Sequence, residues 1–279
     1  MVSLLLDCHE LAARLATDEP PVVLDVRWTL GGPSGAADFA KGHIPGAHFV
    51  DLDRELSAPP GRGRHPLPDA TAFEAAMRRH GVDRSRLVVA YDASTGTSAA
   101  RAWWLLRYFG HQHTALLDGG YAAWVAAGLP VASGDDHDPV PGDFEAVPGG
   151  MPLVDAEGAL AMVGDGVLID ARAPERFRGE TEPVDPVAGH IPGARNVPAQ
   201  QTLSSDGRFL TPSELRARYA GVGVVAGQAV AVYCGSGVVA TEGVFAMGLA
   251  GIDAALYAGS WSEWITDPSR PIEVGESTG

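Results

Sequence analysis

The sequence predicts an α/β protein built from two copies of one domain, each a mostly parallel sheet with helices on both faces. Two observations lead to this prediction. Four sequence blocks occur twice in the same order along the 279 residues, and within each copy short apolar runs alternate with helical patterns. Alternating strands and helices are typical of parallel sheets that are covered by their own helices.

The repeated blocks define the two copies. They are VVLDVR (22–27) with VLIDAR (167–172), KGHIPGAHFV (41–50) with AGHIPGARNV (188–197), LVVAYDAS (87–94) with VAVYCGS (230–236), and LDGGYAAW (117–124) with YAGSWSEW (257–264). A period of this length is too long for a solenoid, so each copy should be a domain with its own core. We expect domains at 1–135 and 153–279. The segment 136–152 between them is rich in Gly, Pro and Asp, which predicts an exposed linker.

Residue spacing predicts the elements within a copy. The runs 22–26 and 87–91 are apolar, rich in β-branched residues and too short for helices, so we expect buried strands. Segments 71–81 and 98–110 place apolar residues at helical spacing and end in Gly, which commonly follows a helix. Ligands of parallel sheets bind beyond the carboxyl ends of the strands. Cys234 follows such a strand directly.

Composition excludes several classes of function. A formal net charge of −15 argues against nucleic acids and anionic membranes as partners, since both attract an excess of Lys and Arg. We expect no membrane span and no signal peptide, because no long apolar run and no basic N-terminal region is present. Cys8 and Cys234 are the only cysteines and lie far apart in the chain, so neither a disulfide framework nor a zinc site is expected. A reduced, cytoplasmic protein is the resulting prediction.

The stretch YCGSGVVAT (233–241) is the candidate reactive site. A strand, a tight loop and a helix over 239–251 are expected here, and the loop would present unpaired N–H groups at the helix N-terminus. Gly235 and Gly237 would let those N–H groups converge into an anion cradle around the Cys234 sulfur, a possible nucleophile. The alternative is a small core cysteine before a turn. The matching residue of the first copy is Asp92, which suggests one catalytic and one supporting domain.

Two enzyme classes use a cysteine loop around an anion. Cysteine phosphatases need an arginine six positions after the cysteine to clamp phosphate, and that position is Ala240 in this chain. Sulfur transfer needs no such arginine, because backbone N–H groups suffice to hold a cysteine persulfide. The loop therefore favours sulfur transfer.

Taken together, the two GHIPGA blocks, DARAPERFRGETEP, the YCGSGV loop and GSWSEW closely resemble the two-domain rhodanese-like sulfurtransferases. That family comprises thiosulfate and 3-mercaptopyruvate sulfurtransferases. The resemblance implies that Cys234 takes sulfur from a small anionic donor as a persulfide and passes it to cyanide or to a thiol such as thioredoxin. It implies no metal and no organic cofactor.

The resemblance also implies the residues that contact the donor. Arg176 matches the family's substrate-binding arginine, Ser236 matches a loop serine that takes part in proton transfer, and His43 matches a histidine that assists it. The loop residues Gly235, Gly237, Val238 and Val239 complete the predicted site.

Simpler interpretations of the same side chains stay open. Arg176 could be a surface residue paired with Glu175 or Glu180, and Ser236 could merely cap the following helix. His43 could stabilise its turn, a role that His190 in the second GHIPGA block would share.

The identity of the sulfur donor follows less directly from the sequence. The loop reads Cys-Gly-Ser-Gly-Val-Val, which resembles the neutral Cys-Gly-Ser-Gly-Val-Thr of the mercaptopyruvate branch with Val239 in place of Thr. A second arginine, expected in that branch nine positions after Arg176, is Asp185 here, and Arg178 or Arg195 could substitute for it. We predict transfer from 3-mercaptopyruvate. Thiosulfate is the alternative donor, and a non-catalytic sulfur carrier or regulatory module is the alternative of another class.

Overall fold

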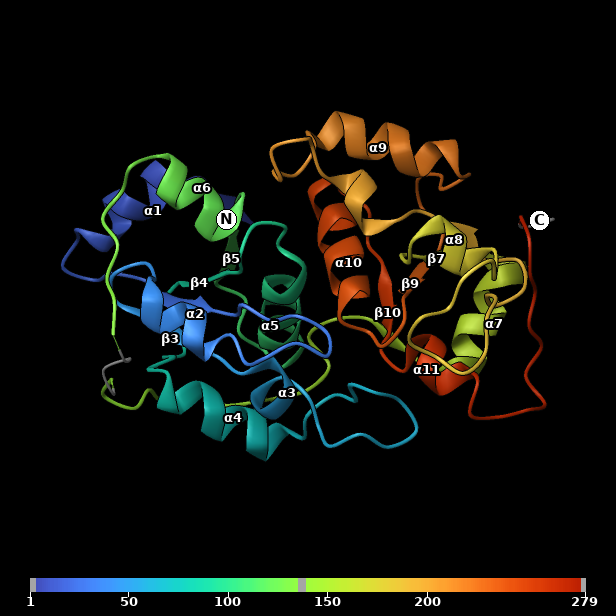
Figure 1. Cartoon of the computed structure of the whole chain (residues 1–279), viewed down its shortest axis with the longest axis horizontal. Coiled ribbons are helices and arrows are strands. Elements are labelled where there is room, and N and C mark those ends of the chain that lie inside the picture. Colours follow the sequence, from blue (N-terminus) through green and yellow to red (C-terminus); the bar gives the residue numbers. More distant parts are fainter. Residues whose placement is uncertain (1–3, 135–138, 277–279) are drawn as a thin grey trace. The chain divides into compact units, whose positions relative to one another are not determined.

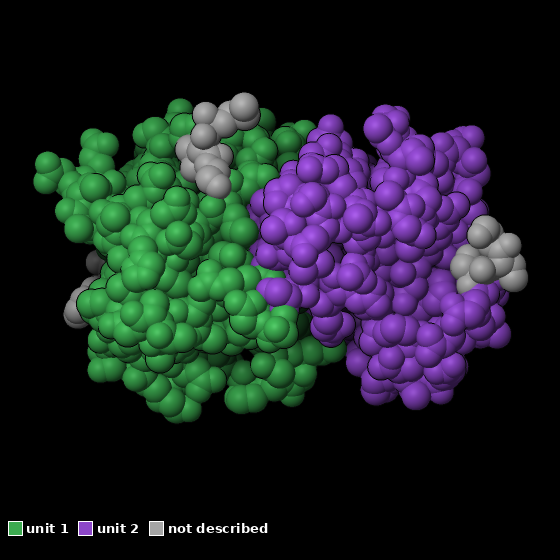
Figure 2. All heavy atoms as spheres, turned by 90° about the horizontal axis from the view of Figure 1, so that it is seen from above, with its two compact units in different colours: residues 1–58, 67–151, 205–208 green, residues 59–66, 152–204, 209–279 purple. Residues whose placement is uncertain are grey.

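The computed structural model describes residues 4–134 and 139–276 and has the predicted α/β architecture (Figure 1). The chain divides into two compact units (Figure 2). Unit 1 comprises residues 1–58, 67–151 and 205–208, and unit 2 comprises residues 59–66, 152–204 and 209–279. Residues 136–138 of the expected linker and the outermost residues of both expected domains lie outside the described residues.

Unit 1 contains a five-stranded sheet in the order β1-β5-β4-β2-β3, and its neighbouring strands pair in parallel. Its strands are β1 (Leu5–Leu6), β2 (Val22–Asp25), β3 (Ala47–Phe49), β4 (Val88–Tyr91) and β5 (Thr114–Leu117). Its helices are α1 (Cys8–Leu15), α2 (Ala36–Lys41), α3 (Leu52–Glu55), α4 (Ala70–Arg79), α5 (Thr97–Tyr108) and α6 (Gly120–Ala126). The predicted strands at 22–26 and 87–91 are β2 and β4.

Helices cover both faces of this sheet because successive strand residues point to opposite sides. Alternate residues such as Val23 and Val89 form one core cluster with α1, α2 and α6. The intervening residues face the other side, where α5 packs on β4 and β5. The predicted helices 71–81 and 98–110 correspond to α4 and α5. Both helices end just before Gly81 and Gly110, whose φ angles of 71° and 99° are left-handed and terminate a helix readily.

Unit 2 repeats the topology, with the sheet order β6-β10-β9-β7-β8 and parallel pairing between neighbouring strands. Its strands are β6 (Leu153–Val154), β7 (Val167–Asp170), β8 (Arg195–Asn196), β9 (Val230–Tyr233) and β10 (Ala255–Tyr257). Its helices are α7 (Ala156–Asp165), α8 (Pro174–Phe177), a 3₁₀ turn (Ala199–Thr202), α9 (Pro212–Gly221), α10 (Val239–Leu249) and α11 (Ser260–Trp264). The predicted helix 239–251 is α10.

A buried ion pair explains why two of the sequence blocks recur. Asp25 pairs with Arg27 and Asp170 pairs with Arg172, each at 2.6 Å, at the carboxyl end of a central strand. Each arginine also donates to the carbonyl of the glycine that precedes the histidine of its own GHIPGA block, at 2.8 and 2.7 Å. The pair therefore fixes the GHIPGA turn against the sheet in both units.

The expectation of an exposed linker is wrong at Phe144. This side chain is 2% exposed and packs on Phe73 of α4, while its carbonyl accepts a hydrogen bond from Arg78 Nε at 2.6 Å. Farther along, the Gly150 N–H donates to the Tyr108 carbonyl at 2.8 Å. A buried aromatic ring and backbone pairing thus bind the described part of this segment to unit 1, in spite of its Gly- and Pro-rich composition.

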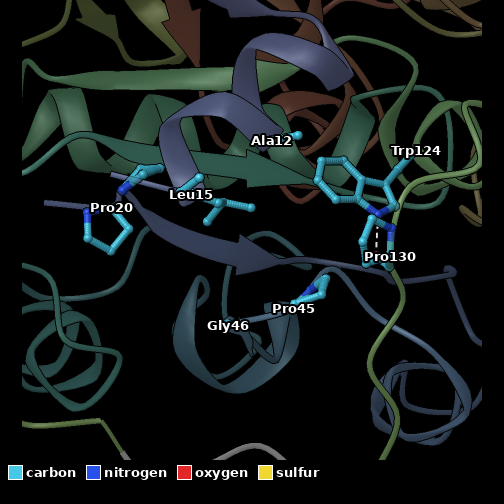
Figure 3. A pocket seen from close by; sticks show the side chains of 9 residues that line it. Ala12, Leu15, Pro20, Pro45, Gly46, Trp124 and Pro130 are labelled. Atoms are coloured by element: carbon cyan, nitrogen blue, oxygen red, sulfur yellow. Dashed lines mark hydrogen bonds between the residues drawn. The ribbon is translucent and has the colours of Figure 1, made fainter. Parts of the chain in front are cut away.

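An apolar pocket of about 420 Å³ lies in unit 1 between α1, α6 and the GHIPGA turn (Figure 3). Its lining consists of Ala12, Leu15, Ala16, Pro20, Pro21, Pro45, Gly46, Trp124 and Pro130. The Trp124 indole N–H is already donated to the Pro130 carbonyl at 2.8 Å. The lining contains no nucleophile and no ionisable group, so the pocket offers no catalytic chemistry.

Among the described residues, no helix is long and apolar enough to cross a membrane.

Candidate active site

Cys234 lies where the sequence predicts it, between the end of β9 and the start of α10. Its side chain is 1% exposed, and the Gly237 N–H donates to its Sγ at 3.2 Å. The Trp261 N–H donates to the Cys234 carbonyl at 2.9 Å, which fastens the loop to α11. The sulfur is therefore held in a fixed position and already receives one backbone N–H.

The two loop glycines serve different purposes. Gly237 has a left-handed φ of 81°, and a Cβ at this position would overlap the carbonyl oxygen of Ala258. Gly235 has no such φ. A Cβ there would lie 2.8 Å from Arg64 Nη2 and 3.6 Å from both Nη atoms of Arg176. Gly237 is needed for the shape of the loop, whereas Gly235 leaves room for two guanidinium groups.

Ser260 supports the loop from the start of α11. It has a φ of 55°, an uncommon conformation for a residue other than glycine, and the matching residue of unit 1 is Gly120 with a φ of 56°. Its Oγ accepts the Cys234 N–H at 3.1 Å and donates to the Tyr257 carbonyl at 2.9 Å. The serine is thus used for its hydroxyl, in a backbone position where the other copy has glycine.

The matching loop of unit 1 shows what this loop geometry binds. The carboxylate of Asp92 accepts the backbone N–H groups of Ser94, Gly96 and Ser98 at 2.9–3.1 Å, and the hydroxyl of Ser98 at 3.2 Å. The Tyr121 N–H donates to the Asp92 carbonyl at 2.8 Å, as the Trp261 N–H does to Cys234. The loop is an anion cradle, and in unit 1 the chain's own carboxylate fills it.

Arg176 is not the surface residue of the simpler interpretation. Its guanidinium pairs with Glu182 at 2.7 Å and with Asp185 at 3.2 Å, rather than with Glu175 or Glu180, and its side chain is 17% exposed. Burial raises the pKa of Glu182, but hydrogen bonds from Arg176 and from the N–H groups of the following turn outweigh burial and hold the pKa below its ordinary value. Glu182 therefore stays ionised and fixes the direction of Arg176.

Segment 59–66 brings two residues to the site that the sequence analysis missed. His65 is 8% exposed and its Nδ1 lies 2.7 Å from the Oγ of Ser236. The neighbouring Arg64 forms an ion pair with Asp185. Neither residue belongs to a repeated block. The available signal was a cluster of basic residues, GRGRHP (61–66), in a chain with a formal net charge of −15.

The histidine beside Ser236 therefore differs from the expected one. His43 lies in unit 1, where its Nδ1 is 2.9 Å from the Phe39 carbonyl oxygen and its ring stacks on the Phe39 ring at 3.8 Å. His190 makes the same two contacts with Phe177, at 2.8 and 3.7 Å. Both GHIPGA histidines thus have the shared turn-stabilising role that was the simpler interpretation.

The remaining residues that the sequence suggests for the site have other environments. Val238 is 1% exposed at the start of α10, and Val239 is half-buried beside it. Arg178 pairs with Glu180 at 2.8 Å, and the guanidinium of Arg195 donates to the Val222 carbonyl, so both potential substitutes for a second arginine are engaged elsewhere. Among residues 4–134 and 139–276, no group of three His, Cys, Asp or Glu side chains is arranged to hold a metal.

Comparison with known proteins agrees with this geometry. The model of the rhodanese-like domain matches the chain twice, over residues 7–127 and 155–267, and so covers most of both copies. The chain belongs to the rhodanese-like family. Each match contains four of the five strands of one sheet and one strand–loop–helix cradle, with Asp92 in the first cradle and Cys234 in the second.

Two kinds of name occur among the rhodanese-like proteins that match this chain over nearly its whole length. A Pseudomonas aeruginosa protein named "Probable 3-mercaptopyruvate sulfurtransferase" is 50% identical over 98% of both chains. A Mycobacterium tuberculosis protein named "Putative thiosulfate sulfurtransferase SseB" is 44% identical over 97% of both. The crystal structure of the Escherichia coli 3-mercaptopyruvate sulfurtransferase SseA superposes with a TM-score of 0.83 at 33% identity, covering 93% of this chain and 99% of that one.

Proposed function

We propose that this protein is a sulfurtransferase that accepts sulfur from 3-mercaptopyruvate on Cys234 and passes it to a thiol or to cyanide. The observation that supports this most strongly is the position of Cys234, in an anion cradle with the guanidinium groups of Arg64 and Arg176 beside Gly235. A sulfur nucleophile thus lies next to groups that bind a carboxylate.

The proposed first half-reaction balances without an external oxidant. The Cys234 thiolate attacks the donor sulfur, a sulfur–sulfur bond forms and the donor's carbon–sulfur bond breaks. The electron pair of that bond leaves with the carbon as the enolate of pyruvate, which then takes up a proton. In the second half-reaction, an acceptor thiolate or cyanide attacks the outer sulfur of the persulfide and releases the Cys234 thiolate. Ping-pong kinetics are expected for such covalent catalysis.

Ser236 and His65 are the groups we propose for handling the proton. Their side chains lie 2.7 Å apart, Ser236 is in the loop of Cys234, and histidine is the side chain most often used in general acid–base catalysis. His65 thereby takes the role expected of His43. The pair would remove the proton from the donor thiol and return it to the enolate carbon.

The acceptor and the compartment are also proposals. Both cysteines are free, which is compatible with a reducing, cytoplasmic setting where a small thiol or a thioredoxin-like dithiol supplies the acceptor. Thiosulfate remains the second candidate donor, because two guanidinium groups would also bind its charged oxygens. Cleavage of thiosulfate releases sulfite and requires no proton on carbon, so a His65 substitution should separate the two donors.

The deciding experiment compares Cys234→Ser with Cys8→Ser, a matched control. Cys8 is buried at the start of α1, and burial raises the pKa of its thiol, so it should not react. We expect the wild type and Cys8→Ser to gain the mass of one sulfur atom after exposure to 3-mercaptopyruvate, and Cys234→Ser to gain none. Sulfur transfer by Cys234→Ser at the wild-type rate would refute the proposal.

The donor is decided by kcat/KM with 3-mercaptopyruvate and with thiosulfate, for the wild type and for His65→Gln. Loss of general acid–base catalysis should lower kcat with 3-mercaptopyruvate by about 10²–10⁴-fold. The rate with thiosulfate should fall much less. A wild-type preference for thiosulfate, together with equal sensitivity of both donors to His65→Gln, would transfer the assignment to thiosulfate.

A further inference from the structure

Arg64 belongs to segment 59–66 of unit 2, and its side chain lies beside the loop of Cys234. Its backbone N–H donates to the Ser262 Oγ at 3.1 Å, which anchors the segment to α11. Its guanidinium lies over Gly235, with Nη2 at 2.8 Å from the place a Cβ would take. The side chain is 25% exposed, so it lies largely buried beside the reactive loop.

The guanidinium of Arg64 has hydrogen-bonding capacity left. Its Nη1 donates to Asp185 Oδ1, and its Nε is buried without a hydrogen-bond partner among the described residues. A buried N–H without a partner costs free energy, and a ligand that accepts it would remove that cost. The unused donors belong to a side chain that lies against the loop of the proposed nucleophile.

Asp185 explains how two arginines can share this place. Its Oδ1 accepts from Arg64 and its Oδ2 accepts from Arg176 Nη2 at 3.2 Å, while its side chain is 3% exposed. Two guanidinium groups beside one glycine would repel each other without a carboxylate between them. Both oxygens of Asp185 accept from the arginines, and these ion pairs offset the repulsion that its charge would exert on an anionic donor.

We propose that Arg64 is the second arginine that binds the carboxylate of the donor, and that Asp185 is a positioning residue that holds Arg64 and Arg176 beside Gly235. The inference rests on the proposed function, since it assigns the donor's carboxylate to that site. Position 185 carries an acid where related mercaptopyruvate enzymes are expected to have an arginine. The chain thus supplies the second guanidinium from position 64 and uses the acid to orient it.

The test uses Arg64→Ala, Arg64→Lys and Asp185→Asn in the full-length protein, with Arg62→Ala as the control. Arg62 is exposed in the same segment, two positions before Arg64, so its substitution removes the same charge from the surface of the segment. The measurements are kcat and KM for 3-mercaptopyruvate, and the competitive inhibition constant of pyruvate, which reports carboxylate binding without chemistry. Urea unfolding midpoints establish that each variant is folded.

Loss of charge-assisted hydrogen bonds should raise KM and the pyruvate inhibition constant of Arg64→Ala by about 10–100-fold, whereas Arg62→Ala should stay within about twofold of the wild type. Arg64→Lys keeps the charge but not the planar fork, and should retain part of the affinity. Asp185→Asn should raise KM with kcat little changed, because it weakens the orientation of both arginines.

The outcomes separate this inference from the proposed function. If the wild type turns over 3-mercaptopyruvate through Cys234 while Arg64→Ala and Arg62→Ala have the same KM and the same pyruvate inhibition constant, the role of Arg64 is refuted and the function stands. If Arg64→Ala does not fold, Arg64→Lys with unchanged pyruvate inhibition refutes it equally. If the wild type does not turn over 3-mercaptopyruvate at all, both proposals are wrong.

Discussion

Replacing each of the two loop glycines by alanine should affect a different property, stability for Gly237 and donor binding for Gly235. In Gly237→Ala, the left-handed φ of 81° costs about 1–2 kcal/mol for a residue with a Cβ. The new methyl group would also overlap the Ala258 carbonyl oxygen, a backbone atom that cannot move independently. Overpacking of this kind costs roughly 1–3 kcal/mol. We therefore expect Gly237→Ala to lower the free energy of unfolding by about 2–5 kcal/mol.

Gly235→Ala changes the site instead of the fold. Its backbone is not left-handed, and the close neighbour of a new Cβ is Arg64 Nη2 at 2.8 Å, the mobile end of a long side chain. Arg64 must retreat by several tenths of an ångström, whereas Arg176 at 3.6 Å is already at ordinary contact distance. The free energy of unfolding should change by no more than about 1 kcal/mol, while KM for 3-mercaptopyruvate should rise about tenfold.

The assay pairs urea unfolding, followed by tryptophan fluorescence, with steady-state kinetics on the same preparations. Gly235→Ala should keep the wild-type unfolding midpoint and lose donor affinity, and Gly237→Ala should show a lower midpoint. The reasoning would be refuted by a Gly235→Ala protein as unstable as Gly237→Ala, or by one with unchanged KM. The first result would mean that the loop backbone cannot accept a methyl group at either position, and the second that the guanidinium groups do not contact the donor.

Three further predictions concern buried charges. Asp92→Ala should lower the stability of unit 1 by about 2–3 kcal/mol in urea unfolding, because several N–H groups lose their acceptor, and Asp92→Asn should lose less since it keeps one oxygen. Asp170→Asn should cost about 3–5 kcal/mol by the same measurement, because it leaves the buried charge of Arg172 without its partner. The pKa of Glu182 lies below its ordinary value of 4.5, so its stabilising contribution is complete above that pH and is lost as the pH falls through the folded-state pKa. Unfolding midpoints of Glu182→Gln should therefore fall less steeply with acidification below about pH 4.5 than those of the wild type.

The fold could be predicted from the sequence because residues within each repeated block interact over short distances along the chain. Asp25 with Arg27, and Asp170 with Arg172, are two residues apart, so a short motif specifies the ion pair and the strand end together. The loop of Cys234 is equally local, since its strand, glycines and helix follow one another. Exposure of the linker was predicted wrongly at Phe144, because composition does not reveal that one aromatic ring finds a place in the core.

The contacts around the reactive loop were harder to predict because they join distant parts of the chain. Arg64 and Asp185 are 121 positions apart, and His65 and Ser236 are 171 positions apart. Segment 59–66 lies outside the four repeated blocks and has no helical or strand periodicity, so neither the blocks nor residue spacing point to it. The sequence shows an acid at position 185, and only the three-dimensional structure shows that it pairs with Arg64 and Arg176.

The carboxylate of Asp92 in its own cradle has a consequence for the first copy of the domain. A group attached to the loop that binds it has an effective concentration far above that of any free metabolite, because no translational freedom has to be lost on binding. A sulfur donor at ordinary cellular concentration would have to displace that tethered anion before it could approach the loop. We therefore expect the first copy not to bind sulfur donors as long as Asp92 occupies its own loop.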